Sequence, residues 1–293
     1  MIRWKGIMWS VHPLFVLIML ASVLTGYFGE LITLFLIVFV HELGHVAAGQ
    51  AFGWKFRVVR LLPFGGVAEV ENGAGVSAKQ EACVAIMGPL QNVWMGLLAL
   101  LLGKLGWWDA SWAAYVWQAN LMIGLFNLLP IHPLDGGRLL QAALSYSLNY
   151  YSMMVWTARV SMLLSLGMII YAMMPLLLEG RGPQANLCMV GFFLLISNWT
   201  YYRNIPYVFF RFLMSRAEAA VRHSGRGAAA QPIVVHRRQS LSSVTRLFWR
   251  ERYHLIYVRG DNGGIMHVLP EEELVDDYLQ GGNPNRAVFE LFR

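Results

Sequence analysis

The chain has 293 residues, of which 57% are hydrophobic and only 14% are charged, and its mean hydropathy is +0.48. A soluble domain usually carries about 25% charged residues, so the composition excludes an ordinary soluble enzyme over the whole length. The net charge of +6 could indicate nucleic-acid binding, but Lys and Arg are spread between apolar runs and form no stripe, so we expect no nucleic-acid partner.

Long apolar runs predict a membrane part over residues 1–212, followed by a linker at 213–231 and a small cytoplasmic domain at 232–293. A helix needs about 20 apolar residues to cross a bilayer. Six segments qualify: about 9–27, 31–52, 81–102, 111–130, 155–178 and 187–203. We therefore predict an all-α polytopic membrane protein with six transmembrane helices, plus a small α/β domain.

Lys and Arg flank the predicted spans unequally. If the N-terminus is cytoplasmic, the outer connections carry only Lys104 and Arg181. The cytoplasmic connections and flanks then carry Arg3, Lys5, Lys55, Arg57, Arg60, Lys79, Arg138, Arg203, Arg211 and Arg216. Since positive residues collect on the cytoplasmic side, this bias predicts a multi-pass protein with both termini in the cytoplasm.

The second span contains His41-Glu42-Leu43-Gly44-His45, an H-E-x-x-H pattern. Residues four apart lie on one face of a helix, so the two imidazoles can bind one metal ion. Glu42 lies one position round the helix, close enough to take a proton from metal-bound water. His41 falls near the middle of the span, where polar side chains are costly unless they serve a polar cavity. The pattern therefore predicts a metal site in preference to a trio of structural polar residues.

Residues 57–70 connect the second and third spans. They are rich in β-branched residues and contain a Gly65-Gly66 turn. This composition predicts a membrane-associated β-hairpin.

The fourth span ends in the sequence NLLPIHPLDGG, residues 127–137. Pro130 and Pro133 break the helix, and Gly136-Gly137 would let the backbone turn sharply. An unwound stretch is tolerated at membrane depth only where it lines a cavity. A catalytic zinc site usually has three protein ligands, and Asp135 could face the histidine pair as the third. An ordinary Pro/Gly turn at the membrane surface is the alternative.

Together, HELGH at 41–45 and N-x-x-P-x-x-P-L-D-G-G at 127–137 resemble the site-2 protease family of intramembrane metalloproteases. LLPFGG at 61–66, GPLQ at 88–91 and the short soluble tail are similar to a bacterial branch of this family that acts in sporulation. The resemblance covers essentially the whole chain.

The resemblance implies one Zn²⁺ per chain, held by His41, His45 and Asp135. Zinc-bound water, deprotonated by Glu42, would attack the scissile carbonyl, and Glu42 would return the proton to the leaving nitrogen. The chain departs from the family pattern at His132, where a bulkier aromatic residue is expected. We expect His132 to lie at the membrane surface and not behind the metal ligands.

The resemblance also implies a membrane-associated pro-protein substrate, pro-sigma-K or a relative, cut near the cytoplasmic face during sporulation. It places the enzyme in the mother-cell membrane around the forespore, restrained by membrane-bound inhibitory or regulatory sporulation proteins. An edge strand of the predicted hairpin could hold an unwound substrate by β-addition, although the hairpin could equally be structural. Asn127 could donate a hydrogen bond to the substrate or cap its own helix. The candidate substrate contacts are Asn127, Pro130, Phe64, Gly65 and Gly66.

The tail is predicted to form a strand at 232–238, an amphipathic helix at 241–253, a hairpin at 254–269 and a second helix at 271–279. This order resembles a single CBS module, a fold that commonly works in pairs and binds adenosyl ligands. The resemblance makes ATP a candidate ligand and implies pairing with a second chain, as a homo-oligomer, or with a substrate. A plain regulatory or substrate-docking domain is the alternative.

Two other functions fit part of the pattern. A catalytically dead scaffold or a metal transporter needs ligands but no base, so the presence of Glu42 argues against it. A zinc protease with Glu69 or Glu81 as third ligand would not need Asp135, so the Gly/Pro frame around Asp135 argues against that.

Overall fold

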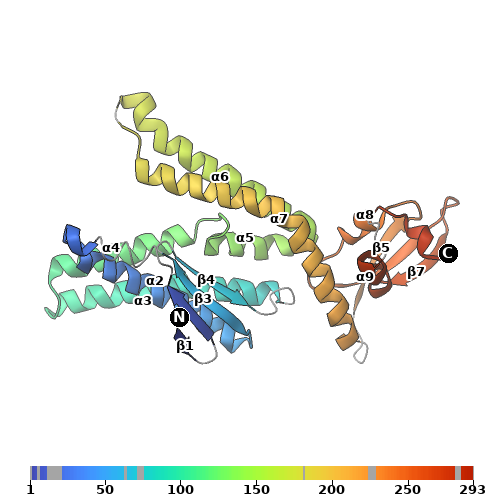
Figure 1. Ribbon diagram of the computed structural model, residues 1–293, viewed down its shortest axis with the longest axis horizontal. Helices are drawn as coiled ribbons and strands as arrows, with labels where there is room; N and C mark the ends of the chain where they lie inside the picture. Colours follow the sequence, from blue (N-terminus) through green and yellow to red (C-terminus); the bar gives the residue numbers. More distant parts are fainter. Residues whose placement is uncertain are drawn as a thin grey trace. The chain divides into compact units, whose positions relative to one another are not determined.

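In the computed structural model, the chain forms two compact units, Met1–Leu140 and Gln141–Arg293. Both units are mainly helical, and each also contains a β-sheet (Figure 1). The structure describes residues 2–4, 7–11, 22–62, 65–70, 76–180, 182–223, 229–280 and 285–292.

Long helices form most of the first unit: α2 (Phe28–Ala51), α3 (Ala78–Lys104) and α4 (Ala110–Asn127). Helix α3 packs against both α2 and α4 (Figure 1). A short helix, α5 (Asp135–Ser145), begins after the loop that follows α4. Both chain segments that carry the predicted metal ligands therefore belong to this bundle.

A four-stranded sheet with the order β1-β2-β3-β4 belongs to the same unit. Its strands are β1 (Ile2–Trp4), β2 (Ile7–Val11), β3 (Phe56–Leu62) and β4 (Gly65–Val70). Strands β3 and β4 are antiparallel, which confirms a hairpin at 57–70, and both contact α2. The predicted contact residue Phe64 lies outside the described residues.

The N-terminal strands correct part of the first predicted span, at about 9–27. Residues 9–11 belong to β2, which pairs in parallel with β3 from Met8 opposite Val58 to Val11 opposite Leu61. The backbone bonds of this segment go to the sheet and not to a helix. A short apolar run fits a buried strand as well as a helix, so the sequence did not distinguish the two. Residues 12–21 of this predicted span lie outside the described residues.

Among the described helices, three are long and apolar enough to cross a membrane: Phe28–Ala51, Ala78–Lys104 and Tyr150–Leu176. They coincide with the second, third and fifth predicted spans. Helices α4 and α7 (Ala185–His223) lie at the fourth and sixth predicted spans but are not in this group. Three candidate spans are therefore shown, and the six-span topology remains a prediction.

The second unit contains a helix pair, α6 (Tyr150–Glu179) and α7, packed along each other (Figure 1). The side chain of Asn149 caps the start of α6, and Gly180 ends the helix at a φ of 63°, which glycine adopts at little cost. Helix α7 continues to His223, so the first part of the linker predicted at 213–231 is helical.

The C-terminal module, residues 230–292, has the predicted β-α-β-β-α order. Its elements are β5 (Ala230–His236), α8 (Leu241–Thr245), β6 (Tyr253–Arg259), β7 (Ile265–Pro270), α9 (Glu271–Gln280) and a final 3₁₀ turn, Val288–Phe292. Strand β6 lies between β5, which is parallel to it, and β7, which is antiparallel. Helix α8 is shorter than the predicted 241–253, because the chain turns after Thr245 and buries Phe248 in the core.

The core of the C-terminal module is continuous with the α6–α7 pair. Phe212 of α7, Met154 of α6 and Phe248 of the module are buried in one hydrophobic cluster. The Arg216 guanidinium lies over the Phe212 ring and forms an ion pair with Glu271 at 2.9 Å. The module is therefore anchored to α7 by both apolar burial and a partly buried ion pair.

A buried histidine makes the module sensitive to acid. The Nδ1 atom of His254 donates to Glu271 at 2.8 Å, and its Nε2 accepts from the Trp249 backbone N–H at 3.1 Å, so the folded ring is neutral. Burial lowers the pKa of His254, as do the charges of Arg216 and Arg252, and the Glu271 hydrogen bond only partly offsets this. An unfolded histidine takes up a proton near pH 6.5. The stabilisation of the folded module by neutral His254 is therefore fully present above about pH 6.5, and it is lost as the pH drops below that value.

We expect the melting temperature of the C-terminal module to fall between about pH 7.5 and about pH 5.5. His254→Gln should reduce this dependence, because the neutral side chain takes up no proton on unfolding. The matched control is His267→Gln, a change at an exposed histidine of the same module. An equal pH dependence in wild type and His254→Gln would contradict the assignment.

Candidate metal centre

The predicted pair of histidines lies on one face of α2, four residues apart. Both side chains are buried, with His41 3% and His45 6% exposed. Their Nε2 atoms are 3.2 Å apart, although the rings stand almost perpendicular, at 85°. The helical spacing thus brings two nitrogen atoms to one point, as the sequence predicts.

Asp135 reaches the same point from the start of α5 and is 6% exposed. Its Oδ2 lies 3.1 Å from His41 Nε2 and 3.2 Å from His45 Nε2. Together these are the described His, Cys, Asp and Glu side chains whose ligand atoms cluster tightly enough to hold a metal ion. The structure therefore brings the three predicted ligands together.

The glycines after Asp135 have a different role from the one expected. Gly136 and Gly137 belong to the first turn of α5, and neither has a positive φ. A Cβ on Gly136 would overlap the carbonyls of Leu128 and Leu129, and a Cβ on Gly137 would overlap the backbone around His132. The expected sharp turn at these two residues is wrong: the glycines are helical and let α5, which begins at Asp135, pack directly against the preceding loop.

The hydrogen bonds of the two imidazoles determine what they present to the centre. His41 Nδ1 lies 2.6 Å from Asn92 Oδ1, and His45 Nδ1 lies 2.7 Å from the carbonyl oxygen of Val84. Each of these partners is an acceptor, so each neutral ring carries its proton on Nδ1. Both Nε2 lone pairs therefore point at the centre.

This arrangement fits a zinc ion. Two nitrogen lone pairs and a carboxylate oxygen face one another at 3.1–3.2 Å, which is repulsive unless a cation lies between them. For bonds of about 2.0 Å, neighbouring ligands of a tetrahedral ion are about 3.3 Å apart. Three protein ligands leave a fourth position open, as in catalytic zinc sites.

Helices α2 and α3 meet at the centre through a pair of glycines. A Cβ on Gly88 of α3 would overlap the His45 ring and lie 2.7 Å from His41 Nε2. A Cβ on Gly44 of α2 would lie 2.7 Å from the carbonyl oxygen of Met87. Only a residue without a side chain therefore leaves the space that a metal ion needs beside the imidazoles.

We expect Gly88→Ala to weaken zinc binding by about 10- to 100-fold, the range seen when the surroundings of a metal ligand are disturbed. Alanine favours a helix over glycine by about 1 kcal/mol, so a loss of metal cannot come from helix propensity. The matched control is Gly167→Ala in α6, where an added Cβ meets nothing within 4 Å. Competition with a zinc chelator measures both variants, and equal affinities would contradict the steric account.

The other predicted site residues have varied positions. Glu42 is buried beside His41, at 9% exposure. The Asn127 amide donates to the Ile123 carbonyl of its own helix at 3.1 Å, as in the helix-capping alternative, and Pro130 is exposed. Gly65 and Gly66 open β4. His132 is only half-buried. The substrate roles and the role of His132 remain predictions.

Comparison with known proteins identifies the family. A model of peptidase family M50 matches residues 29–108 and 104–168, which include Glu42 and the three predicted metal ligands. Stage IV sporulation protein FB of Bacillus subtilis is 32% identical over 283 residues, covering 96% of this chain and 94% of that protein. This chain belongs to peptidase family M50, the site-2 proteases.

Other members of the family agree. The zinc metalloprotease MJ0392 of Methanocaldococcus jannaschii is 33% identical over 148 residues, 49% of this chain and 42% of that protein. The solved site-2 protease from the same organism superposes with a TM-score of 0.55 at 26% identity, covering 69% of this chain and 94% of that chain. The chain is thus a zinc metalloprotease of the site-2 protease family, similar over nearly its whole length to the sporulation protein.

The sequence interpretation missed two residues at the centre of this site-2 protease. Asn92 holds His41, and Gly88 makes room beside both imidazoles. Both fall in or next to the GPLQ segment at 88–91, which served only to support the family resemblance. An asparagine inside an apolar helix is itself a signal, because its amide needs a partner within the protein.

Proposed function

We propose that this site-2 protease is an intramembrane zinc endopeptidase that cleaves a membrane-associated pro-protein near the cytoplasmic face. The observation that carries the proposal is the convergence of His41, His45 and Asp135 beside Glu42, all four at most 9% exposed. Three ligands alone would suit a storage or transport site. A buried carboxylate next to them on α2 adds the base that hydrolysis requires.

The roles of the side chains follow from their positions. His41, His45 and Asp135 would hold the zinc ion, which supplies Lewis-acid polarisation of the attacking water and of the scissile carbonyl. Glu42 takes a proton from the attacking water and passes it to the nitrogen of the broken peptide bond. Burial of these residues excludes bulk water, which strengthens their electrostatic interactions with the developing charges.

The four-stranded sheet offers a means of holding the substrate. A helical substrate must be unwound before cleavage, since its scissile carbonyl is otherwise bonded within the helix. Strand β4 lies at one edge of the described sheet, and an extended substrate segment would add to that edge by backbone hydrogen bonds. In this proposal Phe64, Gly65 and Gly66 contact the substrate near the start of β4, and Asn127 and Pro130 do so beyond α4.

The similarity to the sporulation protein supports a specific biological setting. We assign a substrate of the pro-sigma-K type, in the mother-cell membrane around the forespore, and membrane-bound sporulation proteins as regulators. The proposed topology has six spans and both termini in the cytoplasm, supported by the distribution of Lys and Arg. That orientation puts the soluble bulk of such a substrate on the same side as the C-terminal module.

The C-terminal module is proposed to be a CBS-like regulatory domain that binds ATP and pairs with a second chain. The support is its β-α-β-β-α order and its mixed three-stranded sheet. Calorimetric titration of the intact protein with ATP tests the nucleotide part. Saturable binding is expected, and the absence of any heat of binding would leave a docking role for the module.

Co-expression tests the proposed substrate class. The chain is expressed with a pro-sigma-K-type precursor, and with the same precursor lacking its membrane-associated pro-segment. We expect the first precursor alone to be shortened, with a new N-terminus, found by mass spectrometry, in or next to the pro-segment. Cleavage of both precursors at soluble sites would contradict an intramembrane protease.

A further inference from the structure

Two asparagines are buried in the apolar interior between α3 and α4. Asn92 is 2% exposed and Asn120 is not exposed at all. Burial of an amide without partners costs roughly 2–7 kcal/mol. The hydrogen-bond partners of the two asparagines therefore indicate their role. Neither residue belongs to the predicted set of ligands and catalytic groups.

The hydrogen bonds of these two residues form a chain with one direction. The carbonyl oxygen of Val116 can only accept, and it accepts from Asn120 Nδ2 at 2.9 Å. Asn120 Oδ1 is then the acceptor for Asn92 Nδ2, at 3.3 Å. That leaves Asn92 Oδ1 to accept from His41 Nδ1–H at 2.6 Å. A backbone carbonyl thus fixes the orientation of each amide, and through them the tautomer of His41.

The packing of α3 and α4 is built around this chain of hydrogen bonds. Each helix carries the pattern Asn-x-x-x-Gly, as Asn92 with Gly96 and as Asn120 with Gly124. A Cβ on Gly124 would lie 3.3 Å from the Asn92 Cβ, and one on Gly96 would lie 2.7 Å from the Trp117 ring and 3.4 Å from the Asn120 Cβ. Gly124 makes room for Asn92, and Gly96 makes room for Trp117 next to Asn120, so the two helices approach closely where the amides meet.

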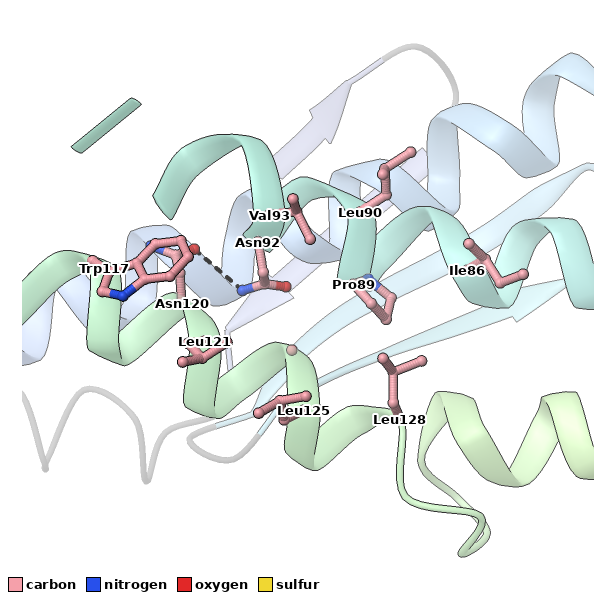
Figure 2. Close-up of a pocket in the computed structure, with 11 residues that line it drawn as sticks. Ile86, Pro89, Leu90, Asn92, Val93, Trp117, Asn120, Leu121, Leu125 and Leu128 are labelled. Atoms are coloured by element: carbon pink, nitrogen blue, oxygen red, sulfur yellow. Dashed lines mark hydrogen bonds between the residues drawn. The ribbon is translucent and has the colours of Figure 1, made fainter. Parts of the chain in front are cut away.

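An apolar groove lies beside the two asparagines. A groove of about 250 Å³ runs between α3 and α4, and Figure 2 shows Pro89, Leu121 and Leu125 along it, with the Asn92–Asn120 hydrogen bond at one end. The exposed surface of the groove is almost entirely apolar. The amides bond to each other and to His41, and offer almost no polar surface to an occupant.

We propose that Asn92 and Asn120 are positioning residues for the zinc site, which hold the His41 ring with Nδ1 protonated and Nε2 directed at the metal. The two histidines are then held differently. His45 bonds to a backbone carbonyl, which no substitution removes. His41 bonds to Asn92, and the hydrogen bond from Asn92 to Asn120 connects the metal site to the contact between α3 and α4. This inference rests on the proposed zinc site.

The test measures metal binding directly, without a substrate. Purified variants are titrated with Zn²⁺ against a chelator, and Co²⁺ replaces zinc so that its visible absorption reports the ligand geometry. We expect Asn92→Ala to weaken zinc binding by about 10- to 100-fold and to alter the Co²⁺ spectrum. Asn92→Asp should restore part of the affinity, because its carboxylate accepts the Nδ1 proton of His41 but cannot donate to Asn120 Oδ1. Asn120→Ala should produce a smaller change in the same direction.

The control is Asn198→Ala, since Asn198 is an equally buried asparagine whose amide donates to the Leu194 carbonyl of its own helix, α7. It should leave zinc affinity unchanged. Zinc affinity within about twofold of wild type in folded Asn92→Ala would overturn the positioning role, as would a zinc affinity of Asn92→Asp no higher than that of Asn92→Ala. If Asn92→Ala does not fold, unchanged affinity in Asn120→Ala overturns it. Wild type that binds no zinc would instead refute the proposed function.

Discussion

Replacement of Glu42 with glutamine is expected to abolish cleavage while one zinc ion per chain remains bound. Glu42 is buried next to His41 on α2, but the ligand cluster consists of His41, His45 and Asp135. Glutamine keeps the shape of the side chain and cannot accept the proton of the attacking water. General acid–base groups contribute about 10²- to 10⁴-fold, so we expect the cleavage rate to fall by about 1,000-fold or more.

Purified wild type and Glu42→Gln are compared for cleavage of a membrane-tethered precursor and, in the same samples, for zinc content. Glu81→Gln on α3 serves as the control, because it makes the same chemical change at another glutamate of the first unit. It should cleave at close to the wild-type rate. Substantial cleavage by Glu42→Gln would show that another group takes the proton.

Asp135→Ala is expected to remove both metal and activity. Its Oδ2 is within 3.2 Å of both Nε2 atoms, so its loss leaves two imidazoles as the protein ligands. Zinc sites with catalytic function usually have three. The change also removes the negative charge that balances the ion, so we expect zinc affinity to fall by at least the roughly 100-fold that smaller disturbances around a metal ligand cause.

Metal analysis after dialysis decides the identity of the third ligand. Glu69→Ala and Glu81→Ala are the controls, because each removes a carboxylate that could act as third ligand in a different type of zinc protease. Both should retain zinc. If Asp135→Ala kept full zinc and activity and either glutamate variant lost them, the three-ligand assignment would be wrong.

Much of the site could be predicted because its spacing is local. The four-residue separation of His41 and His45 places both rings on one face of any helix. Asp135 lies far along the chain, and the family resemblance connected it to the pair. The hairpin and the strand and helix order of the C-terminal module followed equally from local patterns of β-branched residues and glycine turns.

The residues and the strand that the sequence did not predict depend on contacts between segments far apart in the chain. Gly88 and Asn92 matter because α3 lies against α2 at one register, which a pattern along one helix does not reveal. The same holds for Gly136, whose role comes from the loop that precedes it. Strand β2 was taken as part of a membrane span, because each of its residues pairs with a residue 50 positions later in the chain. A signal for Asn92 was nevertheless present in the repeated Asn-x-x-x-Gly of α3 and α4.

The most direct test of a zinc-dependent intramembrane protease is reconstitution of the purified protein with metal. The protein is stripped of metal with a chelator, mixed with a membrane-tethered precursor in detergent, and given Zn²⁺ in steps. Cleavage should be absent from the stripped protein and should return in proportion to bound zinc, reaching its maximum at one ion per chain. Full cleavage by protein with almost no bound zinc would contradict the account.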